Sequence, residues 1–284
     1  RWKIIGIVVF CLLVLSSCTP NKPNKPNNPD QPDISDQPDK PVLSFSIISD
    51  PESDLENLKK ALQKTKEKNL EFVIIPGDLT QTGTPEEFEQ FKQVLGQFDF
   101  EYYLIPGNHD VWYSRKKNTH TFQQFFGPSY YVKQIEDYQF IDQRTTSLWL
   151  VFLDNSDEYL GMGQSQLDWL DQQSSTISHQ SSIIFSHIPF YHPESPKAMG
   201  ELNARLKKEA QDLLNKFCQH PPLAIFSGHL HQTSDYEYSC PNNGPKIRMI
   251  NAGSVNEKRN LQLPRFLKVD LFKNGRLEIE EIEL

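Results

Sequence analysis

The sequence predicts a layered α/β domain, and three observations indicate this class. Short apolar runs rich in Val, Ile and Phe alternate with amphipathic helical stretches from residue 42 to residue 226. The runs are continuously hydrophobic, as in strands that are buried on both faces of a sheet. Beyond residue 232 the pattern changes to strands joined directly by turns, which predicts a mixed sheet late in the chain.

The order of the elements follows from these patterns. The first strand is expected at Val42–Ser49, and the helix after it is expected to start at a capping box of Ser53 and Glu56. Residues 84–87 (TPEE) form a second capping box, with proline at the first helical position. Further strands are predicted at Glu71–Ile75, Phe100–Ile105, Leu148–Leu153, Ser182–Phe185, Leu223–Phe226, Asp235–Tyr238, Lys246–Ile250, Phe266–Phe272 and Arg276–Ile282, and further helices at Gln164–Gln172 and Glu201–Phe217.

The start of the chain differs from the rest. The apolar run Ile4–Leu15 is too short for a transmembrane helix and suits the apolar region of a secretory signal. It ends in LSSC, which resembles a bacterial lipobox. Residues 1–17 are therefore interpreted as a lipoprotein signal peptide and Cys18 as the lipidation site; the alternative is an ordinary signal peptide that contains a cysteine. Residues 18–41, rich in Pro, Asn and Asp, predict a tether that reaches roughly 70 Å.

This organisation predicts where the protein works. We expect Val42–Leu284 to fold as one domain, held by lipid on a bacterial membrane outside the cytoplasm, on the periplasmic or the surface side. The formal net charge is −8, and an acidic surface repels a phosphate backbone, so a nucleic-acid polymer is not an expected partner. Cys218 and Cys240 either form a disulfide or stay as unpaired buried thiols, and both interpretations remain open.

Polar side chains follow five of the predicted strands directly. Because ligands of α/β sheets bind beyond the carboxyl ends of the strands, these side chains are expected to meet at one site. A metal ion, or a pair, is the partner that best satisfies several carboxylates and imidazoles together. Glycines beside them, at positions 77, 107 and 228, are expected to provide backbone freedom. The polar residues are Asp50, Asp78, the run Asn108, His109 and Asp110, then His187, and finally His229 and His231.

These motifs resemble those of the calcineurin-like metallophosphoesterase superfamily. The matching residues are Gly77-Asp78, Gly107-Asn108-His109-Asp110, His187 and Gly228-His229-Leu230-His231, in the order of the family. The resemblance implies a four-layer α/β/β/α sandwich of two mixed sheets, with two divalent metal ions (Mn, Fe or Zn) at the strand ends. It also implies that Asp78 bridges the metals, that Asp50 and His231 hold the first, and that Asn108, His187 and His229 hold the second.

One position departs from the family pattern. The family usually has a histidine two residues after its first aspartate, as a ligand of the first metal, whereas this chain has Glu52. A carboxylate can bind the same metals, but it adds negative charge and favours harder ions. We interpret Glu52 as a ligand or a close neighbour of the first metal. The alternative is that Glu52 turns into solvent and leaves the first site weaker.

The resemblance implies hydrolysis of a phosphodiester or a phosphomonoester by a hydroxide activated between the metals, with nucleotides and cyclic nucleotides among the candidate substrates. His109 is the candidate to stabilise or protonate the leaving oxygen, and Asp110 is expected to fix its tautomer; the alternative is that His109 is a structural histidine beside the metal ligands. Tyr191 and His192, on the loop after His187, are the candidate contacts to this phosphorylated small molecule. The alternative from another class is a non-catalytic binding lipoprotein that keeps the fold with a weakened metal site.

Overall fold

The computed structural model describes residues 40–136, 147–177, 181–201 and 203–284. The predicted signal peptide, Cys18 and nearly all of the tether lie outside the described residues, so these interpretations stay predictions. Among the described residues, no helix combines the length and the apolar character that crossing a bilayer requires.

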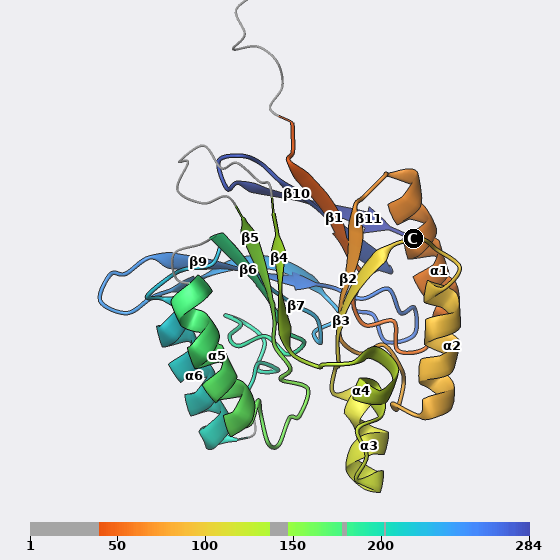
Figure 1. Cartoon of the computed structure of the whole chain (residues 1–284), viewed down its shortest axis with the longest axis horizontal. Coiled ribbons are helices and arrows are strands. Elements are labelled where there is room, and N and C mark those ends of the chain that lie inside the picture. Colours follow the sequence, from red (N-terminus) through yellow and green to blue (C-terminus); the bar gives the residue numbers. More distant parts are fainter. Residues whose placement is uncertain (1–39, 137–146, 178–180, 202) are drawn as a thin grey trace, which may run out of the picture. The chain divides into compact units, whose positions relative to one another are not determined.

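Strands and helices alternate along the described chain, as the sequence predicts (Figure 1). The strands are β1 (Leu43–Ile47), β2 (Phe72–Pro76), β3 (Glu101–Ile105), β4 (Tyr131–Ile135), β5 (Leu148–Phe152), β6 (Ser181–Phe185), β7 (Ala224–Ser227), β8 (Thr233–Ser239), β9 (Lys246–Ala252), β10 (Arg265–Leu271) and β11 (Leu277–Glu283). The helices are α1 (Leu55–Glu67), α2 (Pro85–Leu95), the 3₁₀ turn η2 (His109–Val111), α3 (Trp112–Lys117), α4 (Thr121–Phe126), α5 (Gln164–Ile177) and α6 (Ala204–Phe217).

The strands form two mixed sheets. The first sheet has the order β11-β10-β1-β2-β3, in which β1, β2 and β3 are parallel and the two late strands are antiparallel additions. The second has the order β4-β5-β6-β7-β9-β8, with four parallel strands between two antiparallel edge strands. Parallel strands point the same way, so the carboxyl ends of β1, β2 and β3 share one edge of the first sheet, and those of β6 and β7 share one edge of the second.

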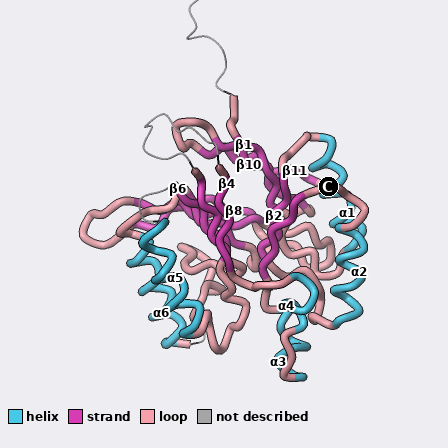
Figure 2. The backbone as a smooth tube through the Cα atoms, in the orientation of Figure 1, coloured by secondary structure: helices cyan, strands magenta, loops and turns pink. Residues whose placement is uncertain are grey.

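Three apolar cores separate four layers, which confirms the predicted α/β/β/α sandwich. The central core lies between the sheets, where Tyr131, Phe152, Phe185 and Phe226 occupy paired positions on neighbouring strands and stack ring on ring, with centroids 4.6–5.6 Å apart. The outer cores pack α1 and α2 on the first sheet and α5 and α6 on the second (Figures 1 and 2). Aromatic pairs at opposed positions stabilise such sheets beyond the apolar area that they bury.

Several local predictions are confirmed, and several are corrected. The capping box of Thr84 and Glu87 starts α2 as predicted. Helix α1, however, is capped by Asp54, whose carboxylate accepts from the Asn57 N–H, and not by Ser53. The sequence did not predict α3, α4 or β4, which have no long apolar repeat. The late strands are also divided between the two sheets, because strand pairing over long chain separations is decided by packing.

A disulfide joins Cys218, at the end of α6, to Cys240, directly after β8. This settles the choice that the sequence left open between a disulfide and two unpaired thiols. Cys240 is buried in the core beneath α6, so the disulfide links that helix covalently to the edge strand β8 of the second sheet.

Candidate metal centre

The predicted ligands lie on the loops that follow β1, β2, β3, β6 and β7, and they converge on one another. These strand ends lie toward the bottom of Figure 1. Loops from the first sheet supply carboxylates and one imidazole, and loops from the second sheet supply imidazoles. Their ligand atoms form three groups in which all atoms lie within 4.8 Å of one another, and Asp78 belongs to each group. The groups are Asp78, His187 and His229; Asp50, Asp78 and His231; and Glu52, Asp78 and His109.

The aspartates tie the loops of the two sheets together. Asp50, which follows β1, accepts hydrogen bonds from the backbone N–H of His229 at 3.0 and 3.1 Å through its two carboxylate oxygens. Asp78, which follows β2, accepts from the backbone N–H of His109 at 2.9 Å, and its other oxygen lies 3.3 Å from Nε2 of His187. Both carboxylates are buried, so these contacts replace water that the folded protein excludes.

Two of the three histidines from the second sheet, His187 and His231, are oriented by backbone carbonyls. Nδ1 of His187 lies 2.9 Å from the carbonyl oxygen of Pro76, and Nδ1 of His231 lies 2.7 Å from that of Arg259. A carbonyl can only accept, so each Nδ1 donates and each Nε2 faces the cluster. Metal-binding histidines are usually held in this way through the nitrogen that does not bind. Oδ1 of Asn108 lies 3.0 Å from Nε2 of His187 and 3.0 Å from Nδ1 of His229, which completes the predicted set.

Burial and charge together perturb the titration of this cluster. Burial would lower the pKa of His187, but the Asp78 carboxylate outweighs it and raises the pKa to about 10. Burial and then the charge of His187 lower the pKa of His229 to about 4. Burial would raise the pKa of Asp78, yet the neighbouring histidines hold it below its ordinary value. Strongly perturbed groups clustered at strand ends are typical of functional sites.

Five of the predicted ligands have a left-handed backbone, which is unfavourable for residues other than glycine. Their φ angles are 50° at Asp50, 41° at Glu52, 52° at Asp78, 70° at His229 and 52° at His231. Such conformations cost of order 1–3 kcal/mol each. Half of the ten non-glycine residues with positive φ in the described part of the chain are thus predicted ligands, and strained backbone of this kind clusters at functional sites.

Two glycines are required for different reasons. Gly77 has φ +97°, and a Cβ added there would also collide with the His187 ring. Gly107 is not in the left-handed region, but a Cβ there would collide with the Asp78 carboxylate. Gly77 therefore provides the predicted backbone freedom, whereas Gly107 provides space.

Glu52 lies inside the cluster. It is 3% exposed, which contradicts the alternative that it turns into solvent. Its Oε1 lies 3.3 Å from Nε2 of His109, 3.3 Å from Nη1 of Arg259 and 3.7 Å from Nε2 of His231. Its Oε2 is buried without a hydrogen-bond partner among the described residues. A buried carboxylate oxygen without a partner is costly, and a cation would satisfy it. The donor set of oxygen and imidazole nitrogen atoms thus fits a divalent metal centre.

The structure corrects the role predicted for Asp110. Its carboxylate accepts from the backbone N–H of Leu79, Thr80 and Gly107, and from the Thr80 hydroxyl, so it joins the loop after β2 to the loop after β3. Nδ1 of His109 instead lies 2.8 Å from the carbonyl oxygen of Gln81. The prediction that Asp110 fixes the His109 tautomer is therefore wrong, because the side chain of the next residue leaves the 3₁₀ turn in another direction. Gln81 orients His109, and no sequence motif indicated it.

The predicted substrate contacts do not line the cavity. Tyr191 packs on Tyr236 and Tyr238 of β8, and Nδ1 and Nε2 of His192 contact Ser195 N–H and the Ser234 hydroxyl. That part of the prediction is not supported, because both side chains contact residues of β8 instead. A cavity of about 230 Å³ opens at the metal cluster, and its lining includes residues that the sequence analysis missed: Lys197, Arg259 and Leu261. Arg259 lies a few residues beyond β9, but no motif marks it.

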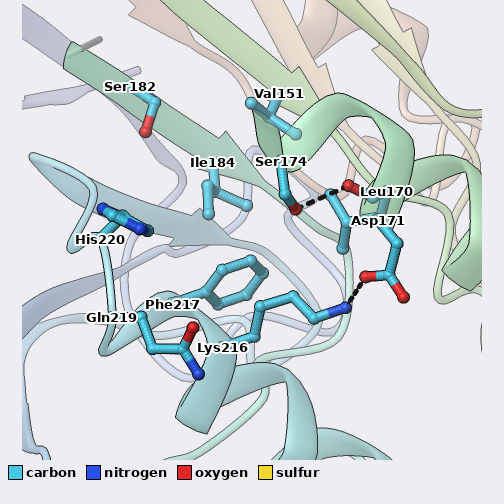
Figure 3. A pocket seen from close by; sticks show the side chains of 10 residues that line it. All are labelled: Val151, Leu170, Asp171, Ser174, Ser182, Ile184, Lys216, Phe217, Gln219 and His220. Carbon is cyan, nitrogen blue, oxygen red and sulfur yellow. Dashed lines mark hydrogen bonds and ion pairs between the residues drawn. The ribbon is translucent and has the colours of Figure 1, made fainter. Parts of the chain in front are cut away.

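A second cavity of about 320 Å³ lies away from this site, against α5, α6, β5 and β6 (Figure 3). Apolar side chains such as Val151, Ile184 and Phe217 form much of its wall, and Lys216 and Asp171 form an ion pair beside it. It contains none of the predicted site residues. The metal cluster is therefore the candidate functional site.

The chain is similar to proteins of known class. Residues 43–233 match the family model of the calcineurin-like phosphoesterases. A probable glycerophosphodiester phosphodiesterase from Arcobacter nitrofigilis is 28% identical over 70% of this chain and 68% of its own length. A 3′,5′-cyclic-nucleotide phosphodiesterase from Nostoc sp. is 25% identical over 65% of this chain, but only 64% of its own length is matched. A crystal structure of a dimetal phosphatase from Danio rerio shares the fold, with TM-score 0.63 and 14% identity over 86% of this chain and 97% of that one.

The two-sheet sandwich with a carboxylate and imidazole cluster at its strand ends defines a metallophosphoesterase. The chain belongs to the calcineurin-like phosphoesterase family, and its class of reaction is the hydrolysis of phosphoesters.

Proposed function

We propose that this protein is a phosphodiesterase that needs two divalent metal ions. The observation that supports this most strongly is the buried set of three interlocking ligand groups that share Asp78. A shared carboxylate suits two ions at the roughly 3.5–4 Å separation of two-metal sites. Asp50 and His231, with Glu52, would hold the first ion, and Asn108, His187 and His229 the second. When bound, such ions lower the pKa of a coordinated water and offset phosphoryl charge.

His109 is the candidate acid for the leaving group. Its ring is held by the Gln81 carbonyl on one side and packs 3.9 Å, centroid to centroid, from Trp112. Its Nε2 lies at the cavity, next to Glu52 and Arg259. From this position Nε2, once protonated, can donate its proton to an alkoxide that leaves phosphorus.

A phosphodiester is the proposed substrate class because relatives of this chain are named as glycerophosphodiester and cyclic-nucleotide phosphodiesterases. The rival proposal is a binding lipoprotein with a weakened metal site. Burial of Glu52 inside the cluster, with a free oxygen, speaks against a weakened site. A protein that had lost its metals would gain nothing from the strained ligand backbone.

Hydrolysis of a generic aryl phosphodiester and its monoester by the purified chain tests this proposal. Turnover is expected with Mn²⁺ and should stop in excess chelator, with the diester as the better substrate. His109→Ala should lower kcat by roughly 10²–10⁴-fold, the usual contribution of a positioned acid. His120→Ala, an exposed histidine outside the cluster, is the matched control and should behave as wild type. Absence of turnover with Mn²⁺, Fe²⁺ and Zn²⁺ would favour the binding protein.

We also propose that the domain is anchored outside the cytoplasm through a lipid on Cys18. The support is the apolar run of residues 4–15 followed by LSSC and a Pro-rich segment. Metabolic labelling of the expressed protein with a tagged fatty acid tests it. Label that is lost in Cys18→Ser would support the anchor, and label that persists would refute Cys18 as its site.

A further inference from the structure

We propose that Arg259 has two successive partners: it is the counter-ion of Glu52 in the metal-free protein and the phosphoryl-binding residue once metal is bound. This rests on the proposed phosphoesterase function. The carboxylate at position 52 adds a negative charge where the family usually has a neutral histidine. Arg259 lies where it can offset that charge and also where a phosphoryl group would enter.

The contacts of Arg259 fit the first role. Its Nη1 donates to Oε1 of Glu52 at 3.3 Å, although the two residues are 207 positions apart in the chain. The same nitrogen lies 3.2 Å from Nε2 of His109. A buried carboxylate needs a compensating charge, and the guanidinium is the nearest arginine or lysine group in contact with it among the described residues.

The exposure of Arg259 fits the second role. Its side chain is 49% exposed while that of Glu52 is 1% exposed, so the pair is buried at one end and open at the other. Arg259 lines the 230 Å³ cavity together with Lys197 and His109. Only one of its guanidinium nitrogens contacts a side chain of the described structure. The remaining donors are free for a planar, bidentate contact with phosphoryl oxygens.

A metal ion would change the partner that Arg259 prefers. The free Oε2 of Glu52 is available to a cation, and a cation held there would take over the compensation of its charge. Arg259 would then be freed from the carboxylate, next to a site that now attracts anions. The loop itself would keep its place, because the Arg259 backbone is held by Asn256 and by Nδ1 of His231 and not by its own side chain.

Calorimetric titration with inorganic phosphate and, separately, with Mn²⁺ tests this proposal. In the Mn²⁺-loaded chain, Arg259→Ala should weaken phosphate binding by roughly 10- to 100-fold, the range for a lost charge-assisted contact, and Arg259→Lys should recover part of it. Lys258→Ala removes the same charge at the neighbouring exposed position and is the matched control, with less than about a twofold change expected at moderate salt. Mn²⁺ should bind Arg259→Ala as tightly as wild type or more tightly, because a positive charge beside the site is gone.

Unchanged phosphate affinity in Arg259→Ala would overturn the second role, and a loss of Mn²⁺ binding would show that Arg259 instead supports the ligands. If Arg259→Ala does not fold, the double variant Glu52→Gln/Arg259→Gln replaces it, and its phosphate affinity is compared with that of Glu52→Gln. Neither of these two variants contains a buried carboxylate without a counter-charge. These titrations need no turnover. If the hydrolysis assay shows no turnover but Arg259→Ala still weakens phosphate binding, the proposed function is rejected and the phosphate-binding role of Arg259 stands.

Discussion

The two sheets contribute different chemistry to the site. The loops of the first sheet supply the oxygen donors Asp50, Glu52, Asp78 and Asn108 and the imidazole of His109, whereas the loops of the second supply the imidazoles His187, His229 and His231 as candidate ligands. The oxygen donors alone would repel one another, and the histidines alone would be buried without counter-charges. Neither half is a stable site by itself. The packing of one sheet on the other therefore forms the site and balances its charge at the same time.

The strongest way to break this balance is to remove the carboxylate shared by both halves. Asp78→Asn should weaken Mn²⁺ binding by roughly 100-fold or more and abolish metal-dependent turnover, because Asp78 belongs to every ligand group. Isothermal titration with Mn²⁺ measures the first effect and the phosphodiester assay the second. Asp212→Asn, on the exposed face of α6, is the control. Equal Mn²⁺ affinity in Asp78→Asn and wild type would contradict the shared role.

A second prediction concerns the second sheet alone. Cys218→Ser/Cys240→Ser opens the link between α6 and the end of β8, so the free energy of unfolding should fall by about 2–4 kcal/mol. Urea denaturation of the metal-free protein measures it, and the oxidised wild type in the same buffer is the reference. The disulfide lies beside α6 and not at the strand ends that carry the metal ligands, so Mn²⁺ affinity should stay within about twofold. A parallel fall in Mn²⁺ affinity would show that the outer layer also positions the histidines.

The smallest change in stability is expected for a substitution of Glu87, in the first turn of helix α2, which packs on the first sheet. Burial would raise the pKa of Glu87, but hydrogen bonds from Thr84 and Thr82 hold it below its ordinary value. A lowered carboxyl pKa stabilises the fold above the unfolded value, near 4.5, and this contribution is lost as the pH falls through the folded pKa. Glu87→Gln should therefore cost about 1 kcal/mol at pH 7, the usual value of a helix cap, and less at pH 3, below the ordinary pKa of the carboxyl group. Urea midpoints at both pH values test it, and a pH-independent cost would contradict the capping explanation.

Much of the site could be predicted because its signals are local. Each of Asp50, Asp78, Asn108, His187 and His229 follows an apolar run directly, and a strand places the next polar residue at its end. The start of α2 was predictable for the same reason, since its capping box lies within four residues. These signals depend only on the backbone conformation of a few residues that are neighbours in the sequence.

The rest depended on contacts between distant parts of the chain. Arg259 contacts Glu52, and Gln81 contacts His109, although no motif connects the loops that carry them. Tyr191 and His192 contact β8 and do not line the cavity. Glu52 could lie in the cluster or in solvent, and the two cysteines could be paired or free, since both alternatives are chemically allowed in each case. The tertiary structure decides, because it buries Glu52 and brings the cysteines together.

By itself, the sequence determined which side chains stand at the ends of which strands, because alternation, capping and strand-ending motifs are local properties. The tertiary structure decided which of those ends face each other. It assigned β10 and β11 to the first sheet, turned Asp110 toward the backbone of a neighbouring loop, and buried Glu52 against Arg259. The reason is physical: burial and charge compensation are properties of the packed whole, and a residue acquires them only from neighbours that the fold brings to it.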